Sequence, residues 1–312
     1  VQKHDMCTLR DRETGDIVSL WWPGTAIILT ILLELPLRSH QARWLDSGEF
    51  DDVIYDLQAG KEIQNPNLRA VLGRREGCLR LLEDSLRQES WVGAYINTNK
   101  TALYREERRG YNIPFIPPEL VTLLDSMRRW NKRYLPDLTS LVTYYEEGKG
   151  RQEFAAVDQS KLPQIAPLFR DPRSPDKNRP PSSDKVARLW LRVLRETQDR
   201  IKRERGVDIQ LTEHNAAGKL VWKYDLHTLR VSGISSMIEN GVPLEVVSEF
   251  VAGHKTLVMT LWYYKNSPGQ LREVIAKAHE TAQSESGFVG GSEFQENIER
   301  FSPFLLSKNA LQ

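Results

Sequence analysis

The chain has 312 residues, of which 40% are hydrophobic and 27% charged, and its formal net charge is +1. This length can bury a sizeable core in one large or two modest domains, and the composition is that of an ordinary globular protein. The most apolar run, residues 26–33, is too short to cross a bilayer, and no signal peptide opens the chain. Cys7 and Cys78 offer neither a disulfide framework nor a metal-ligand spacing, so we expect a reducing cytoplasm and no metal. The chain begins at Val1, so we expect a fragment of a longer protein.

The charged residues are unevenly distributed along the chain. Two basic stretches precede an acidic C-terminal region; their cations are Arg128, Arg129, Lys132 and Arg133, then Lys185, Arg188, Arg192, Arg195, Arg200, Lys202, Arg203 and Arg205. Local basic faces can bind a phosphate backbone even on a nearly neutral chain. Solvated helix faces have the same composition, so both interpretations stay open for these stretches.

The first half of the chain predicts two helices and a strand pair. Residues 25–35 are apolar and end before Pro36, which predicts a buried helix that stops there. Residues 91–98 alternate and are β-prone, and residues 111–116 could pair with them, at a sheet edge because Pro114 lacks a backbone donor. Prolines 117 and 118 then open a helix over residues 119–134.

The second half predicts a long loop followed by helices. The Pro-rich residues 159–183 form the loop, and Ser182 or Ser183 caps a helix that continues to Arg205. Three further helices are predicted over residues 226–240, 244–252 and 256–265, the first capped by Asp225 and ended by Gly241. The fold class expected is mainly α with a small antiparallel β-sheet, that is, α+β.

Four elements of sequence carry the functional pattern. His227 and Arg230 stand three residues apart, on one face of the helix that Asp225 caps. The pair Gly253-His254 follows the next predicted helix, and Tyr263 comes nine residues after His254. Far upstream, Arg38 follows the predicted buried helix. Each element is weak alone, because short motifs recur by chance, but their order and spacing together are specific.

This series resembles the tyrosine recombinase (phage integrase) family, most specifically over YDLHTLRVSGISSMIENGVPLEVVSEFVAGHKTLVMTLWYYK. The resemblance implies the family's catalytic-domain fold, that of DNA breaking and rejoining enzymes. It also implies cleavage and rejoining through a 3′-phosphotyrosine at Tyr263, with no cofactor, metal or ATP. Arg38 and Arg230 would hold the scissile phosphate, while His227 and His254 would donate or accept protons.

The family's general-acid lysine, on a β-hairpin, has two candidates here. Lys100 follows the first predicted strand of the pair, and we prefer it, although it requires an insertion over about residues 62–89. Lys61 is nearer to the usual distance from the first arginine, but its flanks predict a turn. For the other roles, Tyr264 competes with Tyr263, and Arg43 competes with Arg38.

One position departs from the family pattern. An acidic residue often stands three positions after the first arginine, where this chain has Gln41. Either Asp46 or Glu49 could replace that acid, or a hydrogen bond from Gln41 could be sufficient.

The expected organisation is a catalytic domain over residues 1–285 and a flexible or docking tail over residues 286–312. The family's usual N-terminal DNA-clamping domain is not expected in this stretch. The expected partners are double-stranded DNA and further protomers in a synaptic assembly, in a prokaryotic cytoplasm and on the nucleoid when DNA is bound. Integration or excision of a mobile element is the expected role. The alternatives are a type IB topoisomerase-like enzyme, a non-catalytic DNA-binding protein of the same fold, and a chance match.

Overall fold

The computed structural model describes residues 6–84, 88–98, 110–144, 163–243 and 246–247. The chain divides into two units, Val1–Tyr264 and Lys265–Gln312, and the second lies wholly outside the described residues. Three site residues predicted from the sequence, Lys100, His254 and Tyr263, also lie outside them, as do nearly all of the two helices predicted after residue 243.

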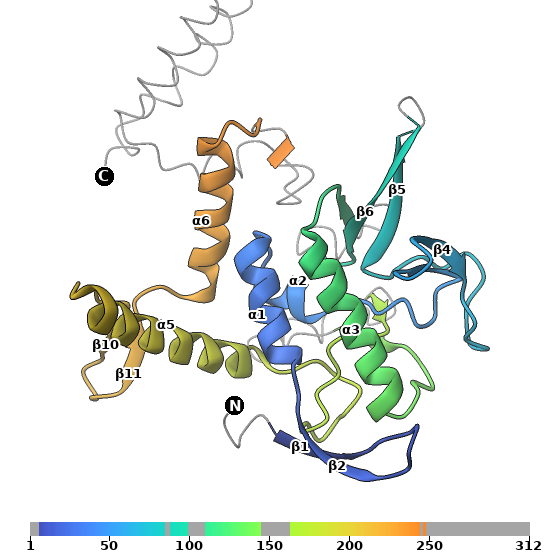
Figure 1. Ribbon diagram of the computed structural model, residues 1–312, viewed down its shortest axis with the longest axis horizontal. Helices are drawn as coiled ribbons and strands as arrows, with labels where there is room; N and C mark the ends of the chain where they lie inside the picture. Colours follow the sequence, from blue (N-terminus) through green and yellow to red (C-terminus); the bar gives the residue numbers. More distant parts are fainter. Residues whose placement is uncertain (1–5, 85–87, 99–109, 145–162, 244–245, 248–312) are drawn as a thin grey trace, which may run out of the picture. The chain divides into compact units, whose positions relative to one another are not determined.

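Helix α1 (Gly24–Glu34) is the centre of the packing. Five of its aliphatic side chains are at most 5% exposed: Ile27, Ile28, Leu29, Ile31 and Leu32. A helix that is apolar on most sides must be covered by other elements. Helix α1 contacts α2 (Ser39–Arg43), α3 (Pro118–Tyr134), α5 (Ser183–Arg205) and α6 (Leu226–Glu239) (Figure 1).

The helix ends follow local chemistry, as the sequence predicts. Helix α1 stops at Glu34, with Leu35 extended before Pro36. The carboxylate of Asp225 accepts a hydrogen bond from the Thr228 backbone N–H at 2.9 Å and so caps α6. Helix α6 ends before Gly241, whose φ of +85° favours glycine.

The main sheet has three antiparallel strands in the order β5 (Leu79–Asp84), β6 (Glu89–Ile96) and β7 (Tyr111–Ile113). Strands β6 and β7 confirm the predicted strand pair, and β7 is at the edge as expected. Strand β6 begins two residues earlier than predicted, and β7 ends at Ile113, because Pro114 has no N–H to continue the ladder.

The described residues also contain four two-stranded antiparallel sheets, where the sequence predicts one small sheet in all. Their strands are β1 (Met6–Arg10) with β2 (Ile17–Trp21), β3 (Val53–Asp56) with β4 (Lys61–Gln64), β8 (Val142–Thr143) with β9 (Gln164–Ile165), and β10 (Thr212–His214) with β11 (Leu220–Trp222). The architecture is α+β with small antiparallel sheets. Residues 62–89, predicted as an insertion, contain β5 and most of β4.

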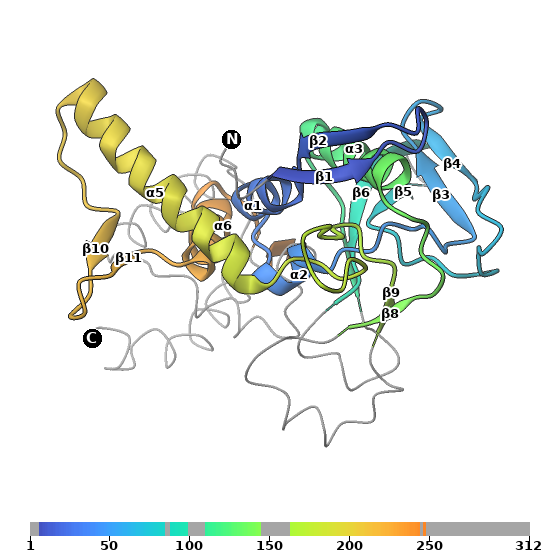
Figure 2. The same cartoon turned by 90° about the horizontal axis from the view of Figure 1, so that it is seen from below.

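Two small elements are fixed to the helices by polar contacts. The β1–β2 hairpin lies against the C-terminal end of α3, where the Arg12 backbone N–H donates to the Arg133 carbonyl at 3.0 Å (Figures 1 and 2). Part of the predicted Pro-rich loop is anchored as well, since Arg43 Nη1 donates to the Pro181 carbonyl at 2.8 Å. Among the described residues, none of the helices combines the length and apolar character needed to cross a membrane.

Candidate functional site

Arg38 lies where the chain passes from α1 to α2. Pro36 prevents α1 from continuing, and the backbone of Arg38 is extended (φ −76°, ψ 148°) immediately before α2 begins at Ser39. The Arg38 side chain is half-buried. The local sequence therefore presents this guanidinium at a helix junction and leaves part of it accessible.

Arg230 reaches the same junction from the other end of the sequence. It is fully buried on α6, and its Nη1 donates a hydrogen bond to the Pro36 carbonyl, 194 residues away along the chain. Helix α6 comes close to this point because residue 233 is glycine: a Cβ there would lie 3.2 Å from the Cβ of Pro36. The two predicted arginines are thus brought together.

His227 belongs to the same group of charges. Partial burial lowers the pKa of His227 below its ordinary value of 6.5; the positive charges of Arg230 and Arg38 lower it further, and Asp225 opposes them. Both guanidiniums therefore act on the imidazole electrostatically. Although part of the ring is buried, His227 keeps enough exposed surface to reach a ligand, and it is neutral near pH 7, so it can accept a proton or donate through its N–H.

Two residues that the sequence did not mark as central, Gln41 and Tyr111, lie beneath this group. Gln41 is fully buried; its Oε1 accepts from the Arg38 backbone N–H at 3.0 Å, and its Nε2 lies 3.4 Å from the Tyr111 hydroxyl. Burial raises the pKa of Tyr111, although the charges of Arg230 and Arg38 and hydrogen bonds from Gln41 and Arg230 counteract this. The Tyr111 hydroxyl is therefore protonated at neutral pH. No sequence motif signals its contact with Arg230.

The alternatives considered from sequence have other partners in the structure. Arg43 donates to the Pro181 carbonyl. The carboxylate of Asp46 accepts from the Gly48 and Ala166 backbone N–H groups and pairs with Arg74. Glu49 accepts from the Leu138 N–H at 3.3 Å. Of Gln41, Asp46 and Glu49, only Gln41 forms a hydrogen bond with Arg38 in the described part of the chain, and it accepts that bond from the Arg38 backbone N–H.

The two candidate lysines are placed differently. Lys61 is exposed and begins β4, directly after the turn of the β3–β4 hairpin, so its flanks are a turn and a strand. Lys100 lies outside the described residues, but the chain leading to it is anchored. Gln41 Nε2 donates to the carbonyl of Thr98, two residues before Lys100, at 2.9 Å.

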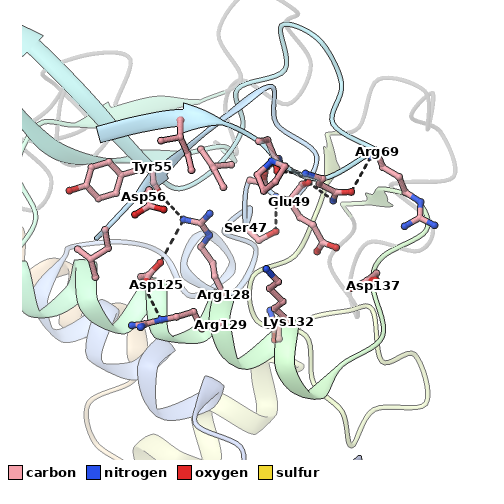
Figure 3. A pocket seen from close by; sticks show the side chains of 18 of the residues that line it. Ser47, Glu49, Tyr55, Asp56, Arg69, Asp125, Arg128, Arg129, Lys132 and Asp137 are labelled. Carbon is pink, nitrogen blue, oxygen red and sulfur yellow. Dashed lines mark hydrogen bonds and ion pairs between the residues drawn. The ribbon is translucent and has the colours of Figure 1, made fainter. Parts of the chain in front are cut away.

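A separate cavity of about 630 Å³ lies between the β3–β4 hairpin, the loop after β4 and helix α3 (Figure 3). Acidic and basic side chains alternate around it: Lys132 points toward Ser47 and Glu49, and Asp125 pairs with Arg129 at 3.0 Å. Neither Arg38, His227 nor Arg230 lines it. Its mixed charges do not select an anionic ligand.

Many cations of the two basic stretches are paired with acids. Among the described residues, ion pairs that involve cations of α5 include Lys185–Asp171, Arg195–Asp199, Arg200–Glu204, Lys202–Asp208 and Arg203–Glu196. On α3, Arg129 pairs with Asp125 and Arg133 with Asp11. This pairing favours solvated helix faces over dedicated phosphate contacts. In the part of the chain that the structure describes, no group of three His, Cys, Asp or Glu side chains could hold a metal ion.

One of three comparisons with known proteins finds a family that matches part of the chain. A family model described as "Putative integrase" matches residues 1–137, and no curated protein matches the chain. Among solved structures, the chain is similar to the Tn1549 transposon integrase in complex with a circular intermediate DNA and in complex with transposon right end DNA. In both cases the identity is 13%, the TM-score is 0.38, and the match covers 81% of this chain and 57% of the other. The family model confirms the integrase resemblance of the sequence over residues 1–137, a stretch that contains Arg38 but neither His227 nor Arg230.

Proposed function

We propose that this chain is a site-specific DNA recombinase that cuts and rejoins DNA through a covalent bond between Tyr263 and a 3′-phosphate. The observation that carries the proposal is the convergence of Arg38, Arg230 and His227 at the junction of α1 and α2. The family match ends at residue 137, whereas the His-x-x-Arg pair lies on α6. Two separate parts of the chain therefore support the same function.

In the first step, the phenolic oxygen of Tyr263 attacks the scissile phosphorus. The P–O5′ bond breaks, and the leaving 5′-oxygen takes a proton from a general acid, for which Lys100 is the candidate. The transition state concentrates negative charge on the non-bridging oxygens, which Arg38 and Arg230 would bind. His227 and His254 would donate a hydrogen bond to an oxygen or accept the proton of the attacking hydroxyl.

In the second step, a 5′-hydroxyl from another strand attacks the phosphotyrosine. The P–O bond to Tyr263 breaks, the phosphodiester forms again, and the tyrosine recovers its proton. Since each step forms one phosphate ester bond for the one that it breaks, neither step consumes ATP. Exchange between two DNA sites requires several protomers, so the working form would be an assembly on DNA in a prokaryotic cytoplasm, serving integration or excision of a mobile element.

The two arginines would have different parts in this chemistry. Arg38 is half-exposed, whereas Arg230 has no exposed surface and is held against the Pro36 carbonyl. Arg38 and His227 would therefore meet the phosphate first. Arg230 would bind it only after the DNA or the surrounding chain makes one edge of its guanidinium accessible.

A suicide substrate tests the proposal directly. DNA nicked close to the cut site loses a short fragment after cleavage, so the covalent complex accumulates and can be seen by denaturing electrophoresis. We expect an adduct with the wild-type chain and none with Tyr263→Phe, while Tyr264→Phe serves as the matched control and retains it. Mass spectrometry of the DNA-linked peptide then identifies the nucleophile. No adduct with any DNA end of the element, or an adduct that survives Tyr263→Phe, would contradict the assignment.

A further inference from the structure

We propose that Gln41 and Tyr111 are positioning residues, which together hold Arg38, Arg230 and the chain at Thr98, just after β6, in one fixed arrangement. This inference rests on the proposed function, because the arrangement matters only if these groups meet a phosphate. The two residues come from α2 and β7, and neither belongs to the motif series that the sequence carries.

The amide of Gln41 joins three parts of the site. Its Oε1 accepts from the Arg38 backbone N–H at 3.0 Å, and its Nε2 donates to the Thr98 carbonyl at 2.9 Å and approaches the Tyr111 hydroxyl at 3.4 Å. Both amide hydrogens are thus used. Only a group that both donates and accepts can make these bonds together, and Gln41 is fully buried, so no water replaces them.

Tyr111 extends this connection to the second arginine. Its hydroxyl receives a hydrogen bond from Arg230, whose Nη1 is bonded to the Pro36 carbonyl. A guanidinium held on two sides does not have to reorient once its remaining edge becomes accessible to a phosphate, so little entropy is lost at that step. Tyr111 is also paired with Ile96 across the sheet, so its ring position is set by β6.

A neutral pair has a different electrostatic effect from an acid. A carboxylate at position 41 would offset part of the positive charge of Arg38 and Arg230, and it would place an anionic oxygen against the Thr98 carbonyl. With Gln41 and a protonated Tyr111, the whole charge of both guanidiniums remains for an anionic ligand. A buried carboxylate without its full set of donors is also costly.

The first test is Tyr111→Phe in the full chain, with Tyr55→Phe as the matched control. Tyr55 lies on β3 and is buried in the same hydrophobic cluster that Tyr111 packs against, but it lines the separate cavity. Single-turnover adduct formation on the nicked substrate gives a rate constant and an amplitude. We expect the rate constant of Tyr111→Phe to fall about 10- to 100-fold with the amplitude retained, as for the loss of an orienting hydrogen bond. Tyr55→Phe should match the wild type.

The second test is Gln41→Glu, which introduces the acid common in the family. We expect its rate constant to be lower than that of the wild type near pH 8, and the ratio of the two to rise as the pH falls. The reason is that only the protonated carboxyl can donate to the Thr98 carbonyl. An equal rate at every pH would contradict the role of the amide.

The remaining outcomes are also decisive. An unchanged rate constant for Tyr111→Phe overturns the proposal. A lower amplitude at an unchanged rate constant overturns it as well, because a smaller folded fraction is what a purely structural residue produces. If the wild-type chain itself forms no adduct, the recombinase function fails first, and the positioning roles fail with it.

Discussion

Arg38 and Arg230, the two arginines of the site, differ in how deeply their side chains are buried. Arg38 takes its position from a helix junction and is half-exposed, whereas Arg230 is fully buried and bonded to the Pro36 carbonyl and the Tyr111 hydroxyl. A buried acceptor that loses its donor costs about 1–3 kcal/mol. We therefore expect Arg230 to contribute to folding stability as well as to the proposed phosphate binding, whereas Arg38 should contribute little to stability.

Alanine at each position should separate these roles. We expect Arg230→Ala to lower the free energy of unfolding by about 1–3 kcal/mol, because it leaves buried acceptors without a donor. Arg38→Ala should change it by less than about 0.5 kcal/mol, as for other substitutions of partly exposed side chains. Urea denaturation measures both values. Both variants should lose adduct formation, and a stable Arg230→Ala protein would show that its hydrogen bonds are replaced.

The first turn of helix α6 holds His227 in place and also influences its pKa. Asp225 caps the helix through the Thr228 N–H and raises the pKa of His227, while burial and the two arginines lower it. The carboxylate of Asp225 provides both the helix cap and the negative charge. Asparagine at this position would keep the cap, because it caps as well as aspartate, but would remove the charge.

Substitutions of Asp225 should therefore give two distinct results. Asp225→Ala should cost about 0.5–2 kcal/mol through loss of the cap, while Asp225→Asn should keep stability at pH 8 and lower the pKa of His227 further. The folded-state pKa of His227 is below its unfolded value, so the unfolded chain binds the proton more readily. Stability is thus complete above the unfolded pKa and falls as the pH drops through it. Urea midpoints between pH 5 and 8 should show a steeper loss toward acid pH for Asp225→Asn than for the wild type.

Some helices and strands of this fold could be predicted from the sequence, and others could not. Helices α1, α3, α5 and α6 follow from apolar runs, prolines and a cap, which are local signals, and the strand pair β6–β7 follows from alternation. The strands β1 to β5 each pair with a neighbouring strand as hairpins, but they are only four to six residues long and mixed in composition, so no periodic pattern predicted them. For the site, the motif series predicted Arg38, His227 and Arg230, whereas Tyr111 could be found only from its position in space.

A buried ionic network joins segments that lie far apart in the sequence. Arg74 pairs with both Asp46 and Asp51, and Asp46 also accepts from the Ala166 N–H at 2.9 Å. Burial raises the pKa of Asp46 although Arg74 lowers it. The segment after residue 163 is thus joined to the sheet region through a carboxylate that needs its partner.

Arg74→Met should be far more harmful than Arg75→Met. Removing one partner of a buried pair typically costs about 3–5 kcal/mol, whereas Arg75, with a side chain 51% exposed, pairs with Glu62 at the surface, where such pairs contribute less than about 1 kcal/mol. The deficit of Arg74→Met should shrink as the pH falls, because Asp46 can then take up a proton in the folded state and no longer needs a cation. Thermal or urea unfolding at pH 5 and pH 8 measures this, and similar losses for both variants would contradict the network's importance.

The hydrogen bond between Arg230 and the Pro36 carbonyl has a consequence during synthesis. The ribosome makes the two partners 194 residues apart, which at about 5–20 residues per second is an interval of roughly 10–40 s. Under the proposed chemistry, a chain released early would carry Arg38 but could never complete the phosphate-binding pair. Products that end before residue 230 would therefore be inactive under this proposal, even where the first part of the fold has already formed.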